Sequence, residues 1–454
     1  MSTSALAAAA PPSRDLSPEE VLLTLSRHLL VDGFDLVLDL TRSEGVWLVD
    51  ARTGKRWLDM FTFFASSALG LNHPKLVGDL EFRDTLGQVA LSKVSNSDIY
   101  TVELARFAET FSRVLGDPEL PHLFFIEGGA LAVENALKVA FDWKSRRNEA
   151  AGRSPEQGTQ VMHLRRAFHG RTGYTLSLTN TETIKTARFP KFAWPRIDSP
   201  AARFPLAEFT AENAAAEASA LAQARAAFEA NPHDIACFVC EPIQGEGGDN
   251  HLRPEFLSAM QALCEEFDAL FVLDEVQSGC GLTGTPWAYQ QLGVHPDIVA
   301  FGKKLQVCGI MAGRRVDEVP DNVFVVSSRL NSTWGGNLTD MVRARRILEV
   351  IESDDLIAHA GHAGQYLQAA LTSLGERHPA LVSNVRGRGL MCALTLPSGA
   401  IRDDILRRCR DEESLLLLGC GTDAIRWRPM LCVSIEELDM AVSKLDAVLA
   451  RIAT

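Results

Sequence analysis

Short apolar runs alternate with helical segments through the middle of this chain, and this alternation constrains its fold more than any other feature. Five runs are predicted to be strands, at residues 161–164, 235–239, 269–273, 298–301 and 324–326. Runs that are apolar throughout are typical of strands buried on both faces, and strands that alternate with helices form mostly parallel sheets. We therefore predict an α/β fold whose large domain is built on a mostly parallel sheet.

The length of the chain favours more than one domain. With 454 residues, 46% of them hydrophobic, it can bury a large core. A helix expected at 339–352 leads into a smaller unit, which contains a strand at 390–396 and a closing helix from Ile435. We predict a disordered tail over residues 1–15, an N-terminal part of a small domain at 16–75, a large domain at 76–340 and a C-terminal part of the small domain at 341–454.

Charge and hydropathy exclude several classes of partner. The formal net charge is −13, whereas nucleic acid and anionic membranes require a basic surface. No apolar stretch approaches membrane-spanning length, and the alanine-rich run Ser2–Pro12 lacks the basic region of a secretion signal. We expect a cytoplasmic protein that binds neither nucleic acid nor membrane.

The nine cysteines are scattered along the chain. The one C-x-x-C pair, Cys237 and Cys240, lies in a predicted strand, where a spacing of three places the two sulfurs on opposite faces. This arrangement argues against a redox or zinc site. Buried thiols in a reducing compartment, with no metal, are expected instead.

Two predicted strands end in residues suited to one cofactor. Asp274 closes the run 269–273 and Lys303 follows the run 298–301, so both reach the sheet edge where open α/β folds bind ligands. A buried carboxylate can keep a pyridine nitrogen protonated, and a lysine held neutral can form an imine. Lys304 would point away from Lys303 on an extended segment. Singly, the aspartate could cap a helix and the lysines could form a solvated edge; together they suggest a pyridoxal phosphate site.

Five further motifs occur in an order that resembles class III aminotransferases. They are Ile-Glu-Gly-Gly-Ala-Leu-Ala-Val-Glu at 126–134, Phe-His-Gly-Arg-Thr at 168–172, Glu-Pro-Ile-Gln-Gly-Glu at 241–246, Asp-Glu-Val-Gln-Ser-Gly at 274–279 and Ser-Thr-Trp-Gly-Gly-Asn at 332–337. The resemblance runs from about residue 30 to the C-terminus, and within the class residues 60–67 and 331–334 resemble the branch that acts on L-lysine. It implies fold type I of the pyridoxal phosphate enzymes, with a large domain and a smaller α+β domain.

The resemblance also assigns cofactor roles. Lys303 would join the cofactor as an imine and then act as the base, and Asp274 would hold the ring nitrogen. Phe168 would stack on the ring with His169 beside it, and Gln277 would reach the phenolic oxygen. All five residues belong to the quoted motifs or follow the strand at 298–301.

The expected phosphate turn departs from the family pattern. Residues 128–130 are Gly-Gly-Ala, where relatives carry Ser-Gly-Ser or Ser-Gly-Ala. Backbone donors at Gly129 and Ala130, at the start of a helix, would therefore bind the phosphate together with the hydroxyls of Ser332 and Thr333. In the family the matching hydroxyl comes from the other subunit, so a homodimer with shared sites is expected. Leu282 also replaces an arginine common in relatives, and the sequence gives no physical reason for it.

Two dissimilar substrates are implied. L-lysine would give its terminal amine to 2-oxoglutarate, yielding L-glutamate and 2-aminoadipate 6-semialdehyde, which can cyclise. Glu246 would neutralise Arg426 while lysine reacts and then release it to the α-carboxylate of the keto acid, and Arg171 would hold the remote carboxylate. Gln277 would border the same substrate space. Arg428 is the neighbouring candidate, but the family pattern Ile-Arg-x-x-Pro matches Arg426. From the residues alone, Glu246 and Arg426 could equally be a surface ion pair.

Three other functions stay open at this stage. A different ω-amine donor, ornithine or 4-aminobutyrate, would keep every catalytic residue and differ in fit near residues 63–65. A non-catalytic module would bind the cofactor and react with no amine. An aminomutase would leave the Glu246 and Arg426 pair without a purpose.

Overall fold

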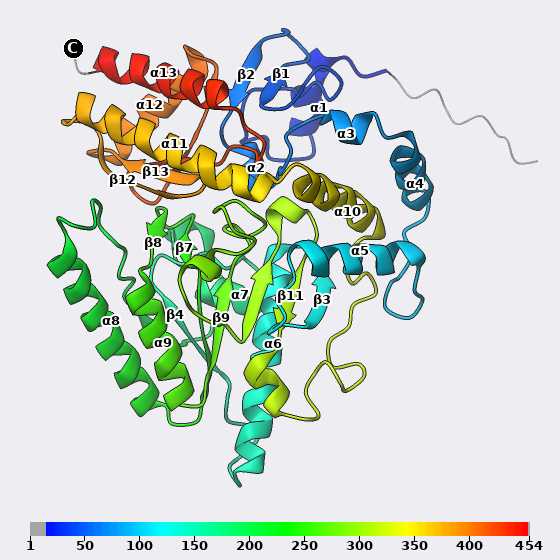
Figure 1. Ribbon diagram of the computed structural model, residues 1–454, viewed down its shortest axis with the longest axis vertical. Coiled ribbons are helices and arrows are strands. Elements are labelled where there is room, and N and C mark those ends of the chain that lie inside the picture. The colour runs from blue at the N-terminus through cyan, green and yellow to red at the C-terminus, as the bar shows by residue number, and fades with distance from the viewer. Residues whose placement is uncertain (1–14, 453–454) are drawn as a thin grey trace, which may run out of the picture.

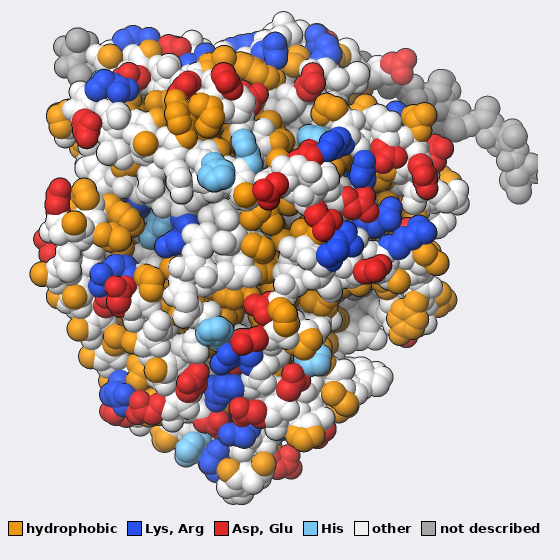
Figure 2. Space-filling model, in the orientation of Figure 1, with side chains coloured by type: hydrophobic (Ala, Val, Ile, Leu, Met, Phe, Trp, Pro, Cys, Tyr) orange, Lys and Arg blue, Asp and Glu red, His pale blue; other side chains and the backbone are white. Residues whose placement is uncertain are grey.

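The computed structural model describes residues 15–452. Figure 1 shows a large body built around a sheet, with the N-terminal and C-terminal parts of the chain lying together above it. Residues 1–14 of the predicted tail lie outside the described range. On the face in Figure 2, acidic and basic side chains are interspersed. Among the described residues, no helix is both long and apolar enough to cross a membrane.

A seven-stranded sheet forms the centre of the large body. Its order is β3 (His122–Ile126), β11 (Cys308–Ala312), β10 (Ile298–Phe301), β9 (Leu270–Asp274), β6 (Ile235–Cys240), β4 (Gln160–Leu164) and β5 (Arg196–Ile197). Strand β11 is antiparallel to both of its neighbours, and the other adjacent pairs are parallel. The predicted mostly parallel α/β sheet is confirmed.

Successive residues of the central strands enter two separate cores, which explains why these strands are apolar throughout. Leu270 and Val272 of β9 pack in the core that contains α6 (Gly129–Ala150). Phe271 and Leu273 face the opposite core, which contains residues of α8 (Thr210–Ala230) and α9 (Pro254–Glu266). The sheet therefore lies between two layers of helices.

The two cysteines of the C-x-x-C pair follow the same alternation. Cys237 packs in the core that contains α6 and Cys240 in the opposite one. Both thiols are buried and free. The expected placement of the two sulfurs on opposite faces is confirmed.

The upper body joins distant parts of the chain. Strands β1 (Trp47–Val49) and β2 (Arg56–Asp59) share a sheet with β14 (Leu415–Leu416), which pairs in parallel with β2. A four-stranded antiparallel sheet lies beside them, in the order β12 (Ser383–Arg388), β13 (Met391–Thr395), β16 (Ala424–Trp427) and β15 (Leu418–Cys420). Its helices are α11 (Leu356–Arg377), α12 (Gly399–Asp411) and α13 (Ile435–Ile452). This pairing supports the proposal that residues 16–75 and 341–454 form one small domain.

The remaining helices, turns and a two-stranded sheet complete the described fold. The remaining α-helices are α1 (Val21–Ser26), α2 (Thr62–Ala65), α3 (Pro74–Val77), α4 (Leu80–Ala90), α5 (Val102–Val114), α7 (Gly173–Leu178) and α10 (Leu338–Ser353). The 3₁₀ turns are η1 (Pro18–Glu20), η2 (Thr183–Lys185), η3 (Ala288–Gln291), η4 (Lys303–Leu305) and η5 (Arg314–Glu318), and β7 (Ile243–Gln244) pairs with β8 (Asn250–His251).

The predicted strand at 324–326 is wrong. These residues form turns, because the side-chain oxygen of Asn322 accepts a hydrogen bond from the backbone N–H of Phe324 at 2.9 Å. The backbone N–H of Val325 donates to the carbonyl of Asn322 at 3.1 Å, and 66% of Val325 is exposed. When an asparagine side chain accepts a hydrogen bond from the backbone two residues later, that bond competes with the hydrogen bonds of strand pairing. The apolar run at 323–326, of four residues, is too short to overcome this competition.

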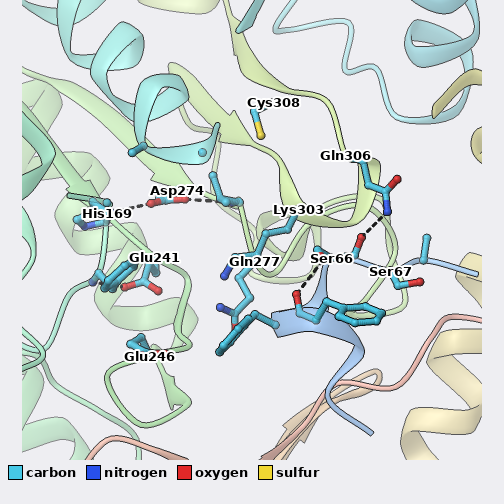
Figure 3. A pocket seen from close by; sticks show the side chains of 18 of the residues that line it. Ser66, Ser67, His169, Glu241, Glu246, Asp274, Gln277, Lys303, Gln306 and Cys308 are labelled. Atoms are coloured by element: carbon cyan, nitrogen blue, oxygen red, sulfur yellow. Dashed lines mark hydrogen bonds and ion pairs between the residues drawn. The ribbon is translucent and has the colours of Figure 1, made fainter. Parts of the chain in front are cut away.

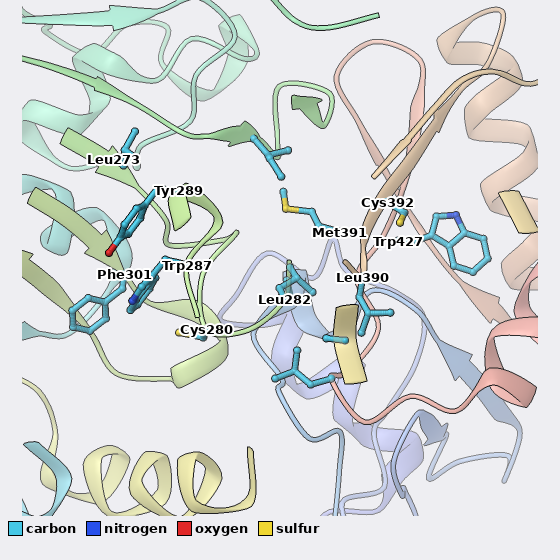
Figure 4. Close-up of a cluster of buried hydrophobic side chains, with 14 of the residues drawn as sticks. Leu273, Cys280, Leu282, Trp287, Tyr289, Phe301, Leu390, Met391, Cys392 and Trp427 are labelled. Atoms are coloured by element: carbon cyan, nitrogen blue, oxygen red, sulfur yellow. The ribbon is translucent and has the colours of Figure 1, made fainter. Parts of the chain in front are cut away.

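Leu282 has a structural role that the sequence did not suggest. Its side chain is buried in the core that also contains Trp287 and Leu390 (Figure 4). Its carbonyl accepts a hydrogen bond from the backbone N–H of Leu390 at 2.9 Å, which ties the large body to the small one. A leucine is the residue type that such an apolar contact favours.

Candidate active site

A cavity of about 1180 Å³ opens at the carboxyl-terminal edge of the large sheet. Strand β9 ends at Asp274, and β10, which runs parallel to it, ends two residues before Lys303. Figure 3 shows residues from both bodies converging on this space. The structure brings all but two of the candidate residues to its walls: Gly129, Ala130, Phe168, His169, Arg171, Glu246, Asp274, Gln277, Lys303 and Arg426.

Lys303 and Lys304 diverge, although the geometry differs from the expected extended segment. They lie in the 3₁₀ turn η4, and Lys303 has a positive φ of 40°. Lys303 lines the cavity, whereas Nζ of Lys304 lies 3.4 Å from the carbonyl of Ser67 and 3.5 Å from that of Pro429. The prediction of an extended segment is therefore wrong. A strained turn directs Lys303 into the cavity instead.

The amine of Lys303 is held in a state suited to imine formation. Burial lowers its pKa to about 8, and the positive charge of Arg426 acts in the same direction. The carboxylates of Glu241 and Asp274 oppose this shift. A substantial share of the amine is therefore neutral near pH 8, and only the neutral amine is nucleophilic.

Asp274 is oriented by two hydrogen-bonding groups. Its Oδ2 lies 2.7 Å from Nδ1 of His169, and its Oδ1 accepts from the backbone N–H of Val276 at 3.0 Å. Burial opposes protonation of His169, but the hydrogen bond to Asp274 and the charge of Asp274 outweigh burial, so the pKa of His169 is raised. The histidine supports a negative charge on the carboxylate. His169 lines the cavity, and its direct partner there is Asp274.

Glu241 is a buried site residue that the sequence analysis did not single out. Its two oxygens accept hydrogen bonds from the backbone N–H groups of Phe168 at 2.9 Å and Gly245 at 3.1 Å. Burial raises its pKa to about 7, although the nearby His169 acts the other way. The residue fixes the backbone that carries Phe168. Its position directly after the apolar strand β6 was the available signal.

The turn before α6 is open to an anion. This helix of 22 residues begins at Gly129, after Gly128 with a positive φ of 92°. A side chain at Gly129 would place its Cβ 2.8 Å from Cγ1 of Val276, so any larger residue would force Val276 to move. The unpaired backbone N–H groups of the first turn and the helix dipole favour a phosphate.

These residues fit pyridoxal phosphate. The cavity combines a helix start for the phosphate, a buried carboxylate for the ring nitrogen and a lysine whose pKa is lowered. Phe168 provides an aromatic wall, and two cations border its ring: Nζ of Lys185 lies 5.5 Å and the guanidinium carbon of Arg171 6.0 Å from its centre. Such a donor set matches an anionic, aromatic aldehyde.

Glu246 and Arg426 form an ion pair inside the cavity, not at the surface. Oε2 of Glu246 lies 2.9 Å from a terminal nitrogen of Arg426, whose side chain is only 4% exposed. Burial favours protonation of Glu246, but the charges of Arg426 and Lys185 outweigh it and lower its pKa to about 2. The carboxylate is therefore charged at neutral pH.

Arg428, two residues after Arg426 and just past the end of β16, serves a different group. Its guanidinium pairs with Asp249, to which Nη1 donates at 2.9 Å, and its Nε donates to Oε1 of Gln277 at 3.1 Å. The amide oxygen of Gln277 is thereby occupied, which leaves the amide nitrogen to donate into the cavity. Gly245 leaves room for this amide, since a Cβ there would lie 2.3 Å from its oxygen.

Ser332 and Thr333 are the candidate residues that do not line this cavity. The carbonyl of Ser332 accepts a hydrogen bond from the hydroxyl of Ser97, and the ring of Trp334 lies 4.6 Å from Nζ of Lys93. Neither contact belongs to the cavity walls. A phosphate contact from these hydroxyls within the same chain is not supported.

The N-terminal wall contains an unusual backbone segment. Four consecutive residues, 62–65, have positive φ values of 43°, 51°, 61° and 69°. Phe63 and Phe64 of this segment line the cavity and are exposed to it or to solvent. Runs of left-handed residues are costly for side chains with a Cβ, so this turn depends on its surroundings. The carbonyl of the next residue, Ser66, accepts a hydrogen bond from Gln306 at 3.1 Å.

The fold and the site define a pyridoxal phosphate enzyme of fold type I. The model of the class-III aminotransferase family matches residues 31–449, so the chain belongs to that family. L-lysine-epsilon aminotransferase from Mycobacterium tuberculosis is 65% identical over 96% of each chain. The enzyme of that name from Streptomyces clavuligerus is 58% identical over 97% of this chain and 96% of its own.

A solved structure agrees with this assignment. The lysine aminotransferase from M. tuberculosis in the internal aldimine form superposes with a TM-score of 0.95 at 65% identity, covering 96% of this chain and 100% of that one. The sequence-based identification of the family is confirmed.

Proposed function

We propose that this enzyme transfers the terminal amino group of L-lysine to 2-oxoglutarate, giving 2-aminoadipate 6-semialdehyde and L-glutamate. The buried ion pair of Glu246 and Arg426 in the same cavity as Lys303 carries this conclusion, because it makes one pocket suit two unlike substrates. The 58–65% identity to L-lysine-epsilon aminotransferases supports lysine as the donor. The two substrates would occupy the pocket in turn, in a ping-pong order.

The roles of the residues follow from their positions. Pyridoxal phosphate, when bound, supplies an electron sink for the reacting carbon. Lys303 would hold the cofactor and would move the proton at the reacting carbon, which its lowered pKa of about 8 favours. Asp274 would keep a proton on the ring nitrogen, and His169 holds that carboxylate in place. Phe168 and Gln277 orient the ring.

The ion pair determines which substrate the pocket accepts. While Glu246 neutralises Arg426, the space near the reacting carbon suits the apolar chain and terminal amine of lysine. Once freed, Arg426 can form two parallel hydrogen bonds to the α-carboxylate of 2-oxoglutarate or L-glutamate. Arg171 borders the same cavity and would hold the remote carboxylate of either substrate.

We also propose a cytoplasmic homodimer in which each subunit completes the phosphate site of the other. Ser332 and Thr333 lie away from the cavity of their own chain, and the turn at 128–130 offers no hydroxyl group. A phosphate there needs donors beyond the helix start. The cysteines are free and mostly buried, in keeping with a reducing compartment.

The direct test mixes the purified protein with L-lysine and 2-oxoglutarate and detects the cyclic imine formed from the product. A comparison of kcat/KM for lysine, ornithine and 4-aminobutyrate tests the donor. A higher value for either alternative would overturn lysine as the substrate. Cofactor absorbance without reaction with any amine would identify a binding module, and turnover without an acceptor would indicate an aminomutase.

A further inference from the structure

Lys185 is a second cation on the carboxylate of Glu246. It ends the 3₁₀ turn η2 (Thr183–Lys185) and is 11% exposed. Its Nζ lies 2.5 Å from Oε1 of Glu246, whereas Arg426 contacts the other oxygen, Oε2, at 2.9 Å. Each carboxylate oxygen therefore has its own positively charged partner.

The surroundings of Lys185 hold its ammonium group in this position. Oε1 of Glu182 lies 2.8 Å from Nζ on the side facing solvent, where the glutamate is 55% exposed. The ring of Phe168 lies 5.5 Å from the same nitrogen, a distance at which cation–π attraction operates. Two anions and two cations thus alternate in the order Glu182, Lys185, Glu246, Arg426. The row is electrically balanced while Arg426 remains paired.

Binding of a dicarboxylate disturbs that balance. If the α-carboxylate of 2-oxoglutarate forms an ion pair with Arg426, Oε2 of Glu246 loses its partner in a site where the Glu246 side chain is only 26% exposed. A poorly solvated charge without a partner is strongly unfavourable. Lys185 already contacts Oε1, so Glu246 can leave Arg426 and stay paired.

We propose that Lys185 is a positioning residue that retains Glu246 when Arg426 turns to the acceptor, and so sets the preference between the two substrates. This inference rests on the exchange proposed above. Without Lys185, Glu246 would have Arg426 as its cationic partner and would release it less readily. The half-reaction with 2-oxoglutarate and L-glutamate would become less efficient, while the half-reaction with lysine would change little.

The test compares both half-reactions in the cofactor-loaded enzyme, followed by rapid-mixing absorbance. Lys185→Met should lower kcat/KM for L-glutamate and 2-oxoglutarate about tenfold or more, and change that for L-lysine by less than about threefold. Lys185→Arg, which restores the charge, should recover the dicarboxylate reactions. If the methionine variant does not fold, Lys185→Gln replaces it in the same comparison.

Lys191→Met is the matched control. Lys191 is exposed and lies outside the cavity, where its Nζ is 3.4 Å from the hydroxyl of Thr186. The control should keep both half-reactions at wild-type rates. Equal losses with lysine and glutamate in Lys185→Met would mean that Lys185 contacts both substrates or supports the fold, and would overturn the proposal. No loss with either substrate would overturn it as well.

The outcome is separable from that of the proposed function. Wild-type enzyme that reacts with L-glutamate but not with L-lysine would overturn lysine as the donor. The Lys185 comparison would then proceed with the ω-amine that does react, because the dicarboxylate reaction is measured independently. Selective loss on the dicarboxylate side would support the role of Lys185 whichever amine is the donor.

Discussion

Nδ1 of His169 lies 2.7 Å from Oδ2 of Asp274, and both side chains are buried at the edge of the large sheet. The aspartate ends strand β9, whereas the histidine belongs to the segment before α7. Their contact fixes the carboxylate that would meet the cofactor ring. The pair is thus an orienting device as well as an ion pair.

Replacement of His169 by phenylalanine should weaken catalysis without removing the cofactor. The lost charge-assisted hydrogen bond corresponds to about 1.5–3 kcal/mol, or roughly 10–150-fold in kcat. Steady-state rates and the pH dependence of the cofactor absorbance measure the effect. His251→Phe is the control, since His251 is buried outside the cavity and its Nε2 makes no hydrogen bond in the described structure. Unchanged kcat in His169→Phe would contradict the orienting role.

Lys303→Ala should abolish turnover, with a loss of about 10⁴-fold or more. The variant should still bind the cofactor non-covalently, because the helix start at Gly129 and the carboxylate of Asp274 remain. Activity assays and absorbance spectra after gel filtration measure the two properties. Lys304→Met serves as the neighbouring control and should retain turnover. Normal activity in Lys303→Ala would refute the assignment.

Covalent capture of the cofactor by the apo-protein should depend on pH through Lys303. The pKa of this amine is lowered to about 8, so the neutral fraction rises roughly tenfold per pH unit below that value and levels off above it. Arg426→Met removes a cation that lowers this pKa, so its profile should move to higher pH. Stopped-flow absorbance across pH 6–10 measures both profiles. A shift of the Arg426→Met profile to lower pH would contradict this role of Arg426.

The amine of Lys303 should also affect the stability of the apo-protein. Its pKa in the folded state, about 8, lies below the ordinary 10.5. The unfolded state therefore binds more protons between these values, and the free energy of unfolding should rise as pH increases from about 8 to 10.5. Urea titrations of wild type and Lys303→Met isolate this contribution. A wild-type curve parallel to that of the variant would contradict it.

Glu246→Ala should weaken the reaction with lysine more than the reaction with glutamate. Without this carboxylate, the positive charge of Arg426 is not neutralised while the amine donor binds. Arg426 can still bind the α-carboxylate of glutamate, because nothing competes for it. We expect a difference of about tenfold, or ~1.4 kcal/mol, between the two values of kcat/KM. Glu255→Gln, which changes an exposed carboxylate outside the cavity, is the control. Equal losses would count against the exchange.

Gly245→Ala should lower the affinity for the cofactor. The new Cβ would lie 2.3 Å from Oε1 of Gln277, so the amide must leave the position that Arg428 fixes. Overpacking of this kind costs about 1–3 kcal/mol, which corresponds to roughly 5–150-fold in Kd. Equilibrium titration of apo-protein measures it. Gly87→Ala in helix α4, where the added carbon meets open space, should leave the affinity unchanged.

Hydrophobic pattern was sufficient to predict four adjacent strands of the seven-stranded sheet and the edge that carries the site, whereas β3, β5 and β11 were not predicted. Strands β4, β6, β9 and β10 fall within one residue of their predicted bounds, because each is buried on both faces and is mostly apolar, with His163 the polar residue inside β4. The same pattern placed Asp274 and Lys303 at neighbouring strand ends. It failed at 324–326, where the hydrogen bond from Phe324 to the side chain of Asn322 forms a turn.

Long-range electrostatic contacts were beyond the sequence. Lys185 lies 61 residues from Glu246 and belongs to no motif, and only the fold brings the two charges together. Glu241 was present in a quoted motif, yet its role depends on two backbone N–H groups that local pattern does not reveal. The turn at Lys303 was missed for a similar reason, since its positive φ is imposed by the surrounding structure.

Strand β14, near the end of the chain, pairs with β2, near its beginning. Ser66 and Arg426, which are also far apart in sequence, border the same cavity. A ribosome must therefore release almost the whole polypeptide before the substrate pocket can close, and until then the early strands lack the neighbour that completes their sheet. Contacts between such distant segments slow folding, and a translation product truncated before β14 would lack both the strand that completes this sheet and the arginine at 426 that lines the pocket.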